Sequence, residues 1–168
     1  SANTELNNLH DKLKEEISVH FRHYDIAPVG YITIDTNNEI LEINQTLAIQ
    51  LGIHKRDLLG HTFNSLIFPD DQDVFYFCCK KTIHDKKPQA CEIRLYTKEM
   101  LPLWVKLDCA PEKHEKGMRI HIGVSDISHL KALEQDLSLS ASVLDECAEM
   151  IIVTDTNGNI IKVNKAFV

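Results

Sequence analysis

The sequence predicts an α+β domain in which a five-stranded antiparallel sheet carries helices on one face and an amphipathic helix flanks it at each end. The first observation behind this is an internal repeat, because residues 32–44 align without gaps on residues 152–164 with six identical positions. The second is the order of signals from the start of the first copy to that of the second, which is β-β-α-α-α-β-β-β.

The repeated segment is predicted to be a hairpin, because two apolar runs flank a turn of Asn, Asp and Gly residues. The offset of 120 residues then measures one domain plus one linker. The chain stops shortly after the second hairpin, which indicates a piece excised from a longer protein. An isolated two-stranded ribbon is marginal in water, so we expect residues 150–168 to be poorly ordered or to pair with a second copy.

Helix signals follow the first hairpin. Asn44 is a plausible N-cap and Gly52 a plausible stop for a short helix, whereas Pro69-Asp70-Asp71 opens a longer one. The predicted helices cover residues 45–51, 55–59 and 69–84, and the later strands cover residues 89–97, 101–110 and 118–126.

Alternation along the strands predicts which side chains face the helices. Apolar residues of this face, with two from the helices and the single tryptophan, are candidates to line a pocket. They are Ile32, Ile34, Leu47, Phe75, Ile93, Leu95, Trp104, Ile120, Ile122 and Val124. A plain apolar core without a ligand explains the same pattern, and both interpretations stay open.

Two leucine stripes flank the domain at helical spacing. We favour their use as dimer seams over packing within one chain, although two heptads need the support of paired domains. The seam candidates are Leu6, Leu9 and Leu13 before the domain and Leu130, Leu133, Leu137 and Leu144 after it.

Composition excludes several function classes. With 18 Lys and Arg against 25 Asp and Glu, the net charge of −7 argues against nucleic acid or direct membrane contact. Five cysteines without a CxxC pair encode neither a disulfide framework nor a zinc site, and they fit a reducing cytoplasm. No nucleophile–base pair, metal ligand set or phosphate loop stands out, so we expect no catalytic and no metal-binding residues.

In order and spacing, a series of short motifs resembles the PAS domain, a sensory domain of bacterial signalling proteins. The motifs are Tyr24 to Tyr31, the hairpin ending at Asn44, Leu58-Leu59-Gly60, Phe68 to Asp71, Cys91 to Leu95, Trp104-Val105 and Asp126-Ile127-Ser128. Asp126-Ile127-Ser128 departs from the family's usual Asp-Ile-Thr by one hydroxyl residue. The resulting division is 1–3 as a cloning remnant, 4–23 as an N-terminal helix, 24–129 as the PAS domain, 130–149 as a coiled-coil-like connector and 150–168 as the truncated start of a second PAS domain.

The resemblance implies a sensory module that binds a small molecule, or pairs with another domain, and relays a change of state through its C-terminal helix. The effector would lie in the same parent chain, as a histidine kinase of a two-component system or a GGDEF or EAL enzyme of cyclic-di-GMP. The relay candidates are Arg94, Asp126, Ile127 and Ser128, with Arg94 paired to Asp126 or Glu92. The alternative is a ligand-free dimerisation and spacer domain.

The cofactors that the resemblance implies each require particular residues. Residues 61–66 read His-Thr-Phe-Asn-Ser-Leu without the cysteine that a light-sensing LOV flavin adduct needs, and His84 at a helix end does not suit a haem ligand. A non-covalent flavin or a small metabolite stays open. Cys78-Cys79 admits a redox role, although simple burial explains the pair better.

Overall fold

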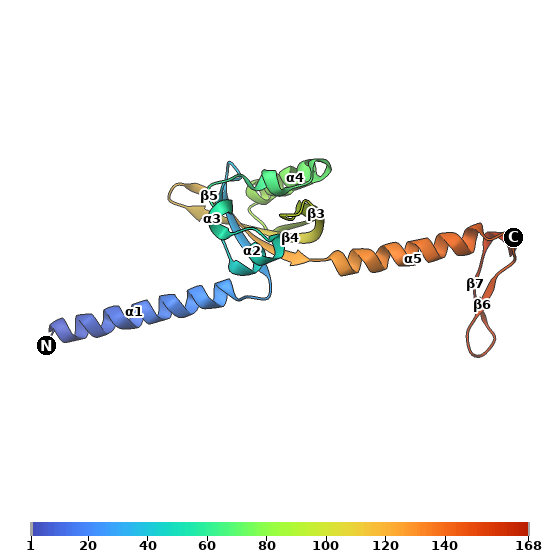
Figure 1. Cartoon of the computed structure of the whole chain (residues 1–168), viewed down its shortest axis with the longest axis horizontal. Coiled ribbons are helices and arrows are strands. Elements are labelled where there is room, and N and C mark those ends of the chain that lie inside the picture. Colours follow the sequence, from blue (N-terminus) through green and yellow to red (C-terminus); the bar gives the residue numbers. More distant parts are fainter. Residues whose placement is uncertain (1, 168) are drawn as a thin grey trace. The chain divides into compact units, whose positions relative to one another are not determined.

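The computed structural model describes residues 2–167 and divides into two compact units, Ser1–Ile127 and Ser128–Val168. Figure 1 labels the elements of both. The first unit contains α1 (Ala2–Asp25), β1 (Gly30–Asp35), β2 (Ile40–Ile43), α2 (Gln45–Leu51), α3 (Lys55–Leu58), 3-10 turns at Phe63–Leu66 and Pro69–Asp71, α4 (Gln72–Asp85), β3 (Gln89–Tyr96), β4 (Pro102–His114) and β5 (Gly117–Asp126).

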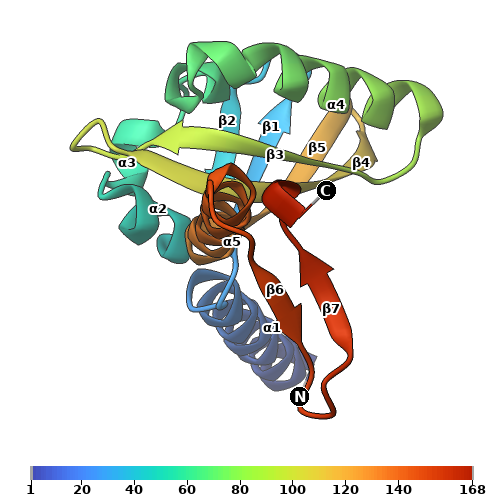
Figure 2. The ribbon, with the colours of Figure 1, turned by 90° about the vertical axis from the view of Figure 1, so that its right-hand side faces the viewer.

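The strands form one five-stranded sheet in the order β2-β1-β5-β4-β3, and every neighbouring pair is antiparallel. β1 and β5 therefore join the N-terminal hairpin to the C-terminal strands at the centre of the sheet. Helices α2, α3 and α4 lie on one face of this sheet (Figures 1 and 2). The predicted α+β fold class is confirmed.

Local sequence signals explain the short helix α2. The side-chain oxygen of Asn44 accepts a hydrogen bond from Leu47 N at 3.1 Å, and Gly52 ends the helix with a left-handed φ of 70°. Both residues act as the sequence predicts. The longer helix also begins at the predicted place, first as a 3-10 turn from Pro69 and then as α4.

Strand β4 runs four residues beyond its predicted end at residue 110. Its partner β3 stops where Gln89 faces Cys109, so the remainder of β4 pairs with β5 alone. Pro111 is tolerated there because an edge position needs no ladder hydrogen bond from its nitrogen. The predicted strand was therefore too short at its C-terminal end.

The second unit contains α5 (Ser128–Glu146), β6 (Ile152–Thr154), β7 (Ile160–Val163) and a 3-10 turn at Lys165–Phe167. Its hairpin repeats the first one in detail. Asp35 Oδ1 accepts from the backbone of Asn37 and Glu39, and Asp155 Oδ1 accepts in the same way from Asn157 and Asn159. The sequence repeat is therefore also a repeat of hydrogen bonding.

Candidate functional site

Apolar side chains fill the space between the sheet and its helices. Nine of the ten pocket candidates are at most 1% exposed, so almost none of their surface is open to solvent. They are Ile32, Ile34, Leu47, Phe75, Ile93, Leu95, Ile120, Ile122 and Val124. Phe63 and Phe75 pack edge to face with ring centroids 5.1 Å apart. This packing supports the plain-core interpretation of the nine residues.

The helices contribute to the same core. Leu47 of α2 and Phe75 of α4 have no accessible surface. The imidazole of His84 is 86% exposed at the end of α4 and contacts Asp85 at 2.9 Å, so it does not reach the core as an iron ligand.

Trp104 does not line the core, and its prediction as a pocket residue was wrong. The core-facing residues of β4 are Val105, Leu107 and Cys109, so alternation turns Trp104 to the opposite face of the sheet. Trp104 lies opposite Arg94 of β3, whose guanidinium carbon is 5.3 Å from the indole centroid.

Arg94 is the centre of a cluster that we call the Arg94 assembly, formed by Phe68, Asp71, Arg94 and Trp104. Its guanidinium donates two hydrogen bonds to Asp71, from Nε to Oδ2 at 2.8 Å and from Nη2 to Oδ1 at 2.9 Å. Its guanidinium carbon also lies 5.2 Å from the ring centroid of Phe68. A bidentate contact of this kind is stronger and more directional than an ordinary surface ion pair.

The partner of Arg94 therefore differs from the predicted Asp126 or Glu92. Strand β3 is at the edge of the sheet, and Arg94 N donates to Asp71 Oδ2 at 2.8 Å while Arg94 O accepts from Phe68 N at 3.1 Å. The segment before α4 thus covers this part of the open edge. The Asp71 carboxylate thus accepts hydrogen bonds from both the backbone and the side chain of Arg94.

The assembly leads to the end of the first unit. Trp104 O accepts a hydrogen bond from Ile127 N at 2.9 Å. Asp126, the preceding relay candidate, ends β5 opposite Val105, and Ser128 is the first residue of α5. A continuous series of contacts therefore joins the start of α4 to Ile127 through β3 and β4.

The ion pair makes this connection dependent on pH. Hydrogen bonds from Arg94 lower the pKa of Asp71, and Asp71 in turn raises the pKa of Arg94. Because the folded-state pKa of Asp71 is lowered, the stability that the pair contributes is fully present above the unfolded carboxyl pKa of about 3.9. It is lost as the pH falls through the lower folded-state pKa.

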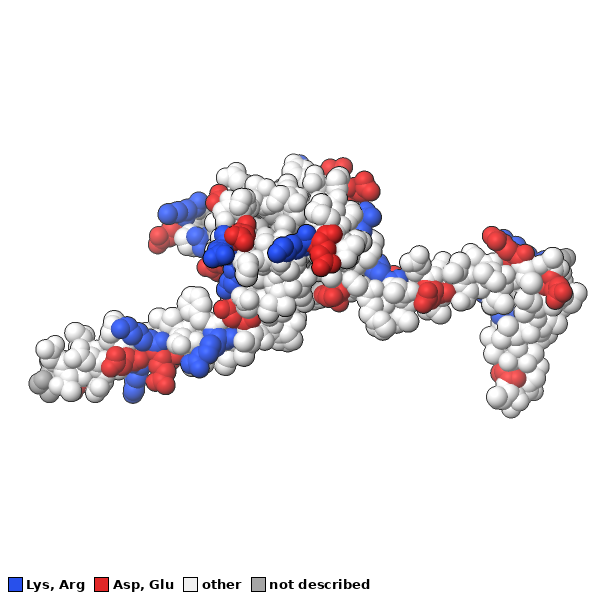
Figure 3. Space-filling model, in the orientation of Figure 1, with Lys and Arg blue, Asp and Glu red and all other residues white. Residues whose placement is uncertain are grey.

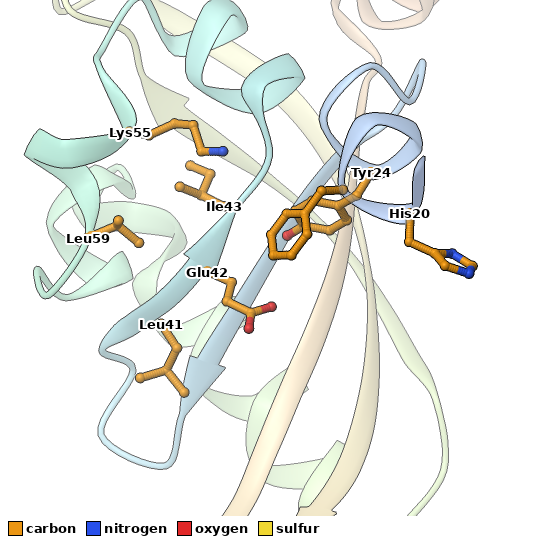
Figure 4. Close-up of a pocket in the computed structure, with 8 residues that line it drawn as sticks. His20, Tyr24, Leu41, Glu42, Ile43, Lys55 and Leu59 are labelled. Atoms are coloured by element: carbon orange, nitrogen blue, oxygen red, sulfur yellow. The ribbon is translucent and has the colours of Figure 1, made fainter. Parts of the chain in front are cut away.

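A groove that the sequence did not reveal lies between α1 and the β2–α3 region. Its volume is about 370 Å³, and Figure 4 shows its lining side chains. They are His20, Phe21, Tyr24, Leu41, Glu42, Ile43, Lys55 and Leu59. Burial, together with the charge of Glu42, raises the pKa of Tyr24 to about 12, so its phenol stays neutral at physiological pH. In the sequence, the sign of this groove was Leu41, an apolar residue at an outward-facing position of β2.

The N-terminal seam candidates Leu6, Leu9 and Leu13 are 49–64% exposed on α1, and the stripe continues through exposed Ile17 and Phe21. Charged residues of both signs are interspersed with uncharged surface along this helix in Figure 3.

The C-terminal seam candidates lie on α5. Leu130, Leu133 and Leu137 are also exposed. Leu144 is half-buried and lines a small hollow with Ile151 and Val163 of its own hairpin. It is therefore less exposed than the other seam candidates.

Within residues 2–167, no group of three or more His, Cys, Asp and Glu side chains is arranged to hold a metal ion. No helix in the same range has the length and apolar character needed to cross a membrane.

Comparison with known proteins yields a consistent result. A family model described as PAS domain matches residues 28–129, and a second PAS domain model matches residues 138–168. The probable diguanylate cyclase DgcE of Escherichia coli (strain K12) is 27% identical over 124 residues, which are 71% of this chain. The chain spans only 11% of the length of that relative.

Solved structures share the fold. The PAS domain of an HTR-like protein from Haloarcula marismortui superposes with a TM-score of 0.63 and 16% identity, covering 72% of this chain and 99% of that one. A PAS domain from Colwellia psychrerythraea gives 0.60 and 19%, covering 67% and 98%. A PAS domain of a two-component sensor histidine kinase gives 0.55 and 15%, covering 67% and 98%.

Proposed function

This chain belongs to the PAS domain family, and we propose that it relays a change of state through the segment after Asp126 to an effector in the same parent protein. The similarity to DgcE supports a diguanylate cyclase as that effector, with a histidine kinase as the alternative. The chain itself would carry no catalysis. Its five free cysteines favour work in the reducing cytoplasm.

The Arg94 assembly is the observation that carries this proposal. It joins the 3-10 turn before α4 to strands β3 and β4 and to Ile127, the last residue before α5. A displacement of α4 would pull on Asp71, and hence on Arg94, Trp104 and the hydrogen bond to Ile127. This path uses the Arg94 and Ile127 relay candidates but places Asp71 where Asp126 was expected.

Hydrogen exchange tests the path. In Asp71→Asn the bidentate ion pair is lost at nearly constant shape, so we expect the Ile127 amide to exchange about tenfold faster than in wild type. The measurement is residue-resolved amide exchange at neutral pH. Unchanged exchange at Ile127, with the protein still folded, would contradict the proposed relay.

Asp70 provides a matched control. Its carboxylate lies 3.6 Å from Arg94 Nη2 with the side chain 84% exposed, against 14% for Asp71. Such an exposed contact contributes little, so Asp70→Asn should leave exchange at Ile127 unchanged. Equal acceleration in both variants would show a general effect of charge rather than a path through Asp71.

A second function, ligand-free dimerisation and spacing, is favoured by the filled core and the exposed stripe of α1. Exposed leucines at helical spacing are stabilised by burial against another helix. The groove beside Phe21 and Tyr24 extends the same apolar surface. We propose a homodimer in which the α1 stripes of two copies pair with each other and the coiled-coil-like α5 helices form a second pair. This role is compatible with relay and needs no small molecule.

Leu13→Asp tests the α1 seam. A charge in the middle of the stripe replaces burial worth about 1.5–3 kcal/mol per leucine, so we expect dimer affinity to fall at least about tenfold. Analytical ultracentrifugation over a concentration series measures this. Asn8→Asp introduces the same charge on the opposite side of α1 and should leave the association unchanged. A wild-type chain that stays monomeric throughout the series would contradict the homodimer.

A further inference from the structure

Four of the five cysteines gather where α4 packs against the sheet. Cys78 and Cys79 come from α4, Cys91 from β3 and Cys109 from β4. The Sγ atoms of Cys78 and Cys109 are 3.9 Å apart, although the two residues are 31 positions apart in the sequence. The sequence drew attention to the adjacent pair Cys78-Cys79, whereas the structure gives Cys78 a thiol neighbour on another element.

The contacts in this cluster favour the thiolate form of Cys78 over the thiolate forms of Cys91 and Cys109. Contacts with the Cys109 and Cys91 thiols lower the pKa of Cys78, and the nearby Lys81 ammonium acts in the same direction. The same contacts raise the pKa of Cys109 and Cys91. Cys78 is 8% exposed and Cys109 is fully buried, so a small oxidant meets Cys78 before Cys109.

We propose that Cys78 and Cys109 form a peroxide-sensitive thiol pair whose oxidation links α4 to β4 by a disulfide. The Cys78 thiolate attacks hydrogen peroxide, the O–O bond breaks, and the sulfur becomes a sulfenic acid while the released hydroxide takes up a proton to become water. The Cys109 sulfur, after losing its proton, then attacks the sulfenic sulfur and a second water leaves. Overall, two thiols and one peroxide give one disulfide and two waters.

Forming this bond requires the two sulfur atoms to move closer together. A disulfide needs the two sulfur atoms about 2.05 Å apart, so they must approach by roughly 2 Å. Vicinal cysteines on one helix point about 100° apart, which disfavours the competing link between Cys78 and Cys79. Cys91 is half-buried beside the pair and is the competing partner that the test must separate.

Non-reducing peptide mapping of the folded chain tests the pair. The chain is treated with hydrogen peroxide, its free thiols are blocked with N-ethylmaleimide, and trypsin then releases peptide 57–80 with Cys78 and Cys79 and peptide 107–113 with Cys109. We expect these two peptides to appear joined, with the loss of two hydrogen atoms, and to separate after dithiothreitol. Peptide 87–94, which holds Cys91, should remain unlinked.

Single variants assign the sulfur atoms. Cys78→Ala and Cys109→Ala should each abolish the linked peptide, whereas Cys79→Ala and Cys147→Ala should retain it; circular dichroism checks the fold of each variant. Linkage that persists in Cys78→Ala or Cys109→Ala would overturn the assignment. So would a link to peptide 87–94, or peroxide treatment that leaves peptides 57–80 and 107–113 unjoined.

Discussion

Replacing Asn44 with alanine is expected to lower the free energy of unfolding of the first unit by about 2–4 kcal/mol. The side chain is fully buried and makes four hydrogen bonds to backbone atoms. It accepts from Tyr31 N at 2.8 Å and from Leu47 N, and it donates to Tyr24 O at 2.9 Å and Val29 O at 3.0 Å. Alanine would leave these groups without the partner they now have.

Asn44 holds three parts of the fold together: the end of α1, the start of β1 and the first turn of α2. Urea unfolding followed by the fluorescence of Trp104 measures the effect, because this single tryptophan reports on the first unit alone. Asn44→Asp separates acceptor from donor, since it keeps the two accepted bonds but places a carboxylate against the carbonyls of Tyr24 and Val29. We expect it to be at least as destabilising as alanine.

The repeat supplies a matched control in Asn164. It accepts from Ile151 N at 2.9 Å and donates to Cys147 O at 3.3 Å and Glu149 O at 2.8 Å in the second unit, as Asn44 does in the first. Asn164→Ala should therefore leave the Trp104-detected transition unchanged. A similar shift in both variants, or none in Asn44→Ala, would contradict the role given to Asn44.

The predictable parts of the fold are those governed by local signals. The N-cap at Asn44, the stop at Gly52 and the alternation of Ile120, Ile122 and Val124 depend on neighbouring residues only, and each agrees with the structure. The two hairpins were predictable for the same reason. Asp35 and Asp155 each organise a turn through hydrogen bonds to backbone atoms within four residues.

The candidate site was less predictable because its contacts join distant segments. Which carboxylate meets Arg94 depends on β3 being an edge strand whose open side faces Asp71, 23 residues earlier. The placement of Trp104 depends on which residues of β4 face the core. The pairing of β4 with β3, in which Trp104 lies opposite Arg94, sets this rather than a local motif. The contact between Cys78 and Cys109 needs the packing of α4 on the sheet as well.

Replacing Phe75 with alanine is expected to lower the free energy of unfolding by about 3–5 kcal/mol. Phe75 has no accessible surface and packs edge to face on Phe63, so truncation loses apolar contact and leaves a cavity under the sheet. The same urea titration measures the loss. Phe77→Ala on the same helix is the control, because Phe77 is 64% exposed and its truncation should change stability little.

The wild-type chain and these two variants also test whether the core binds a ligand. Because the wild-type core is filled, native mass spectrometry of the purified chain should show no mass beyond the polypeptide. The cavity in Phe75→Ala should instead take up a small apolar probe such as benzene, which stabilises the folded state because it binds that state and not the unfolded chain. We expect benzene to raise the melting temperature of Phe75→Ala and not that of wild type or Phe77→Ala. A bound mass in the wild-type chain would show that the core opens for a ligand, and the module would then sense through that molecule rather than through packing alone.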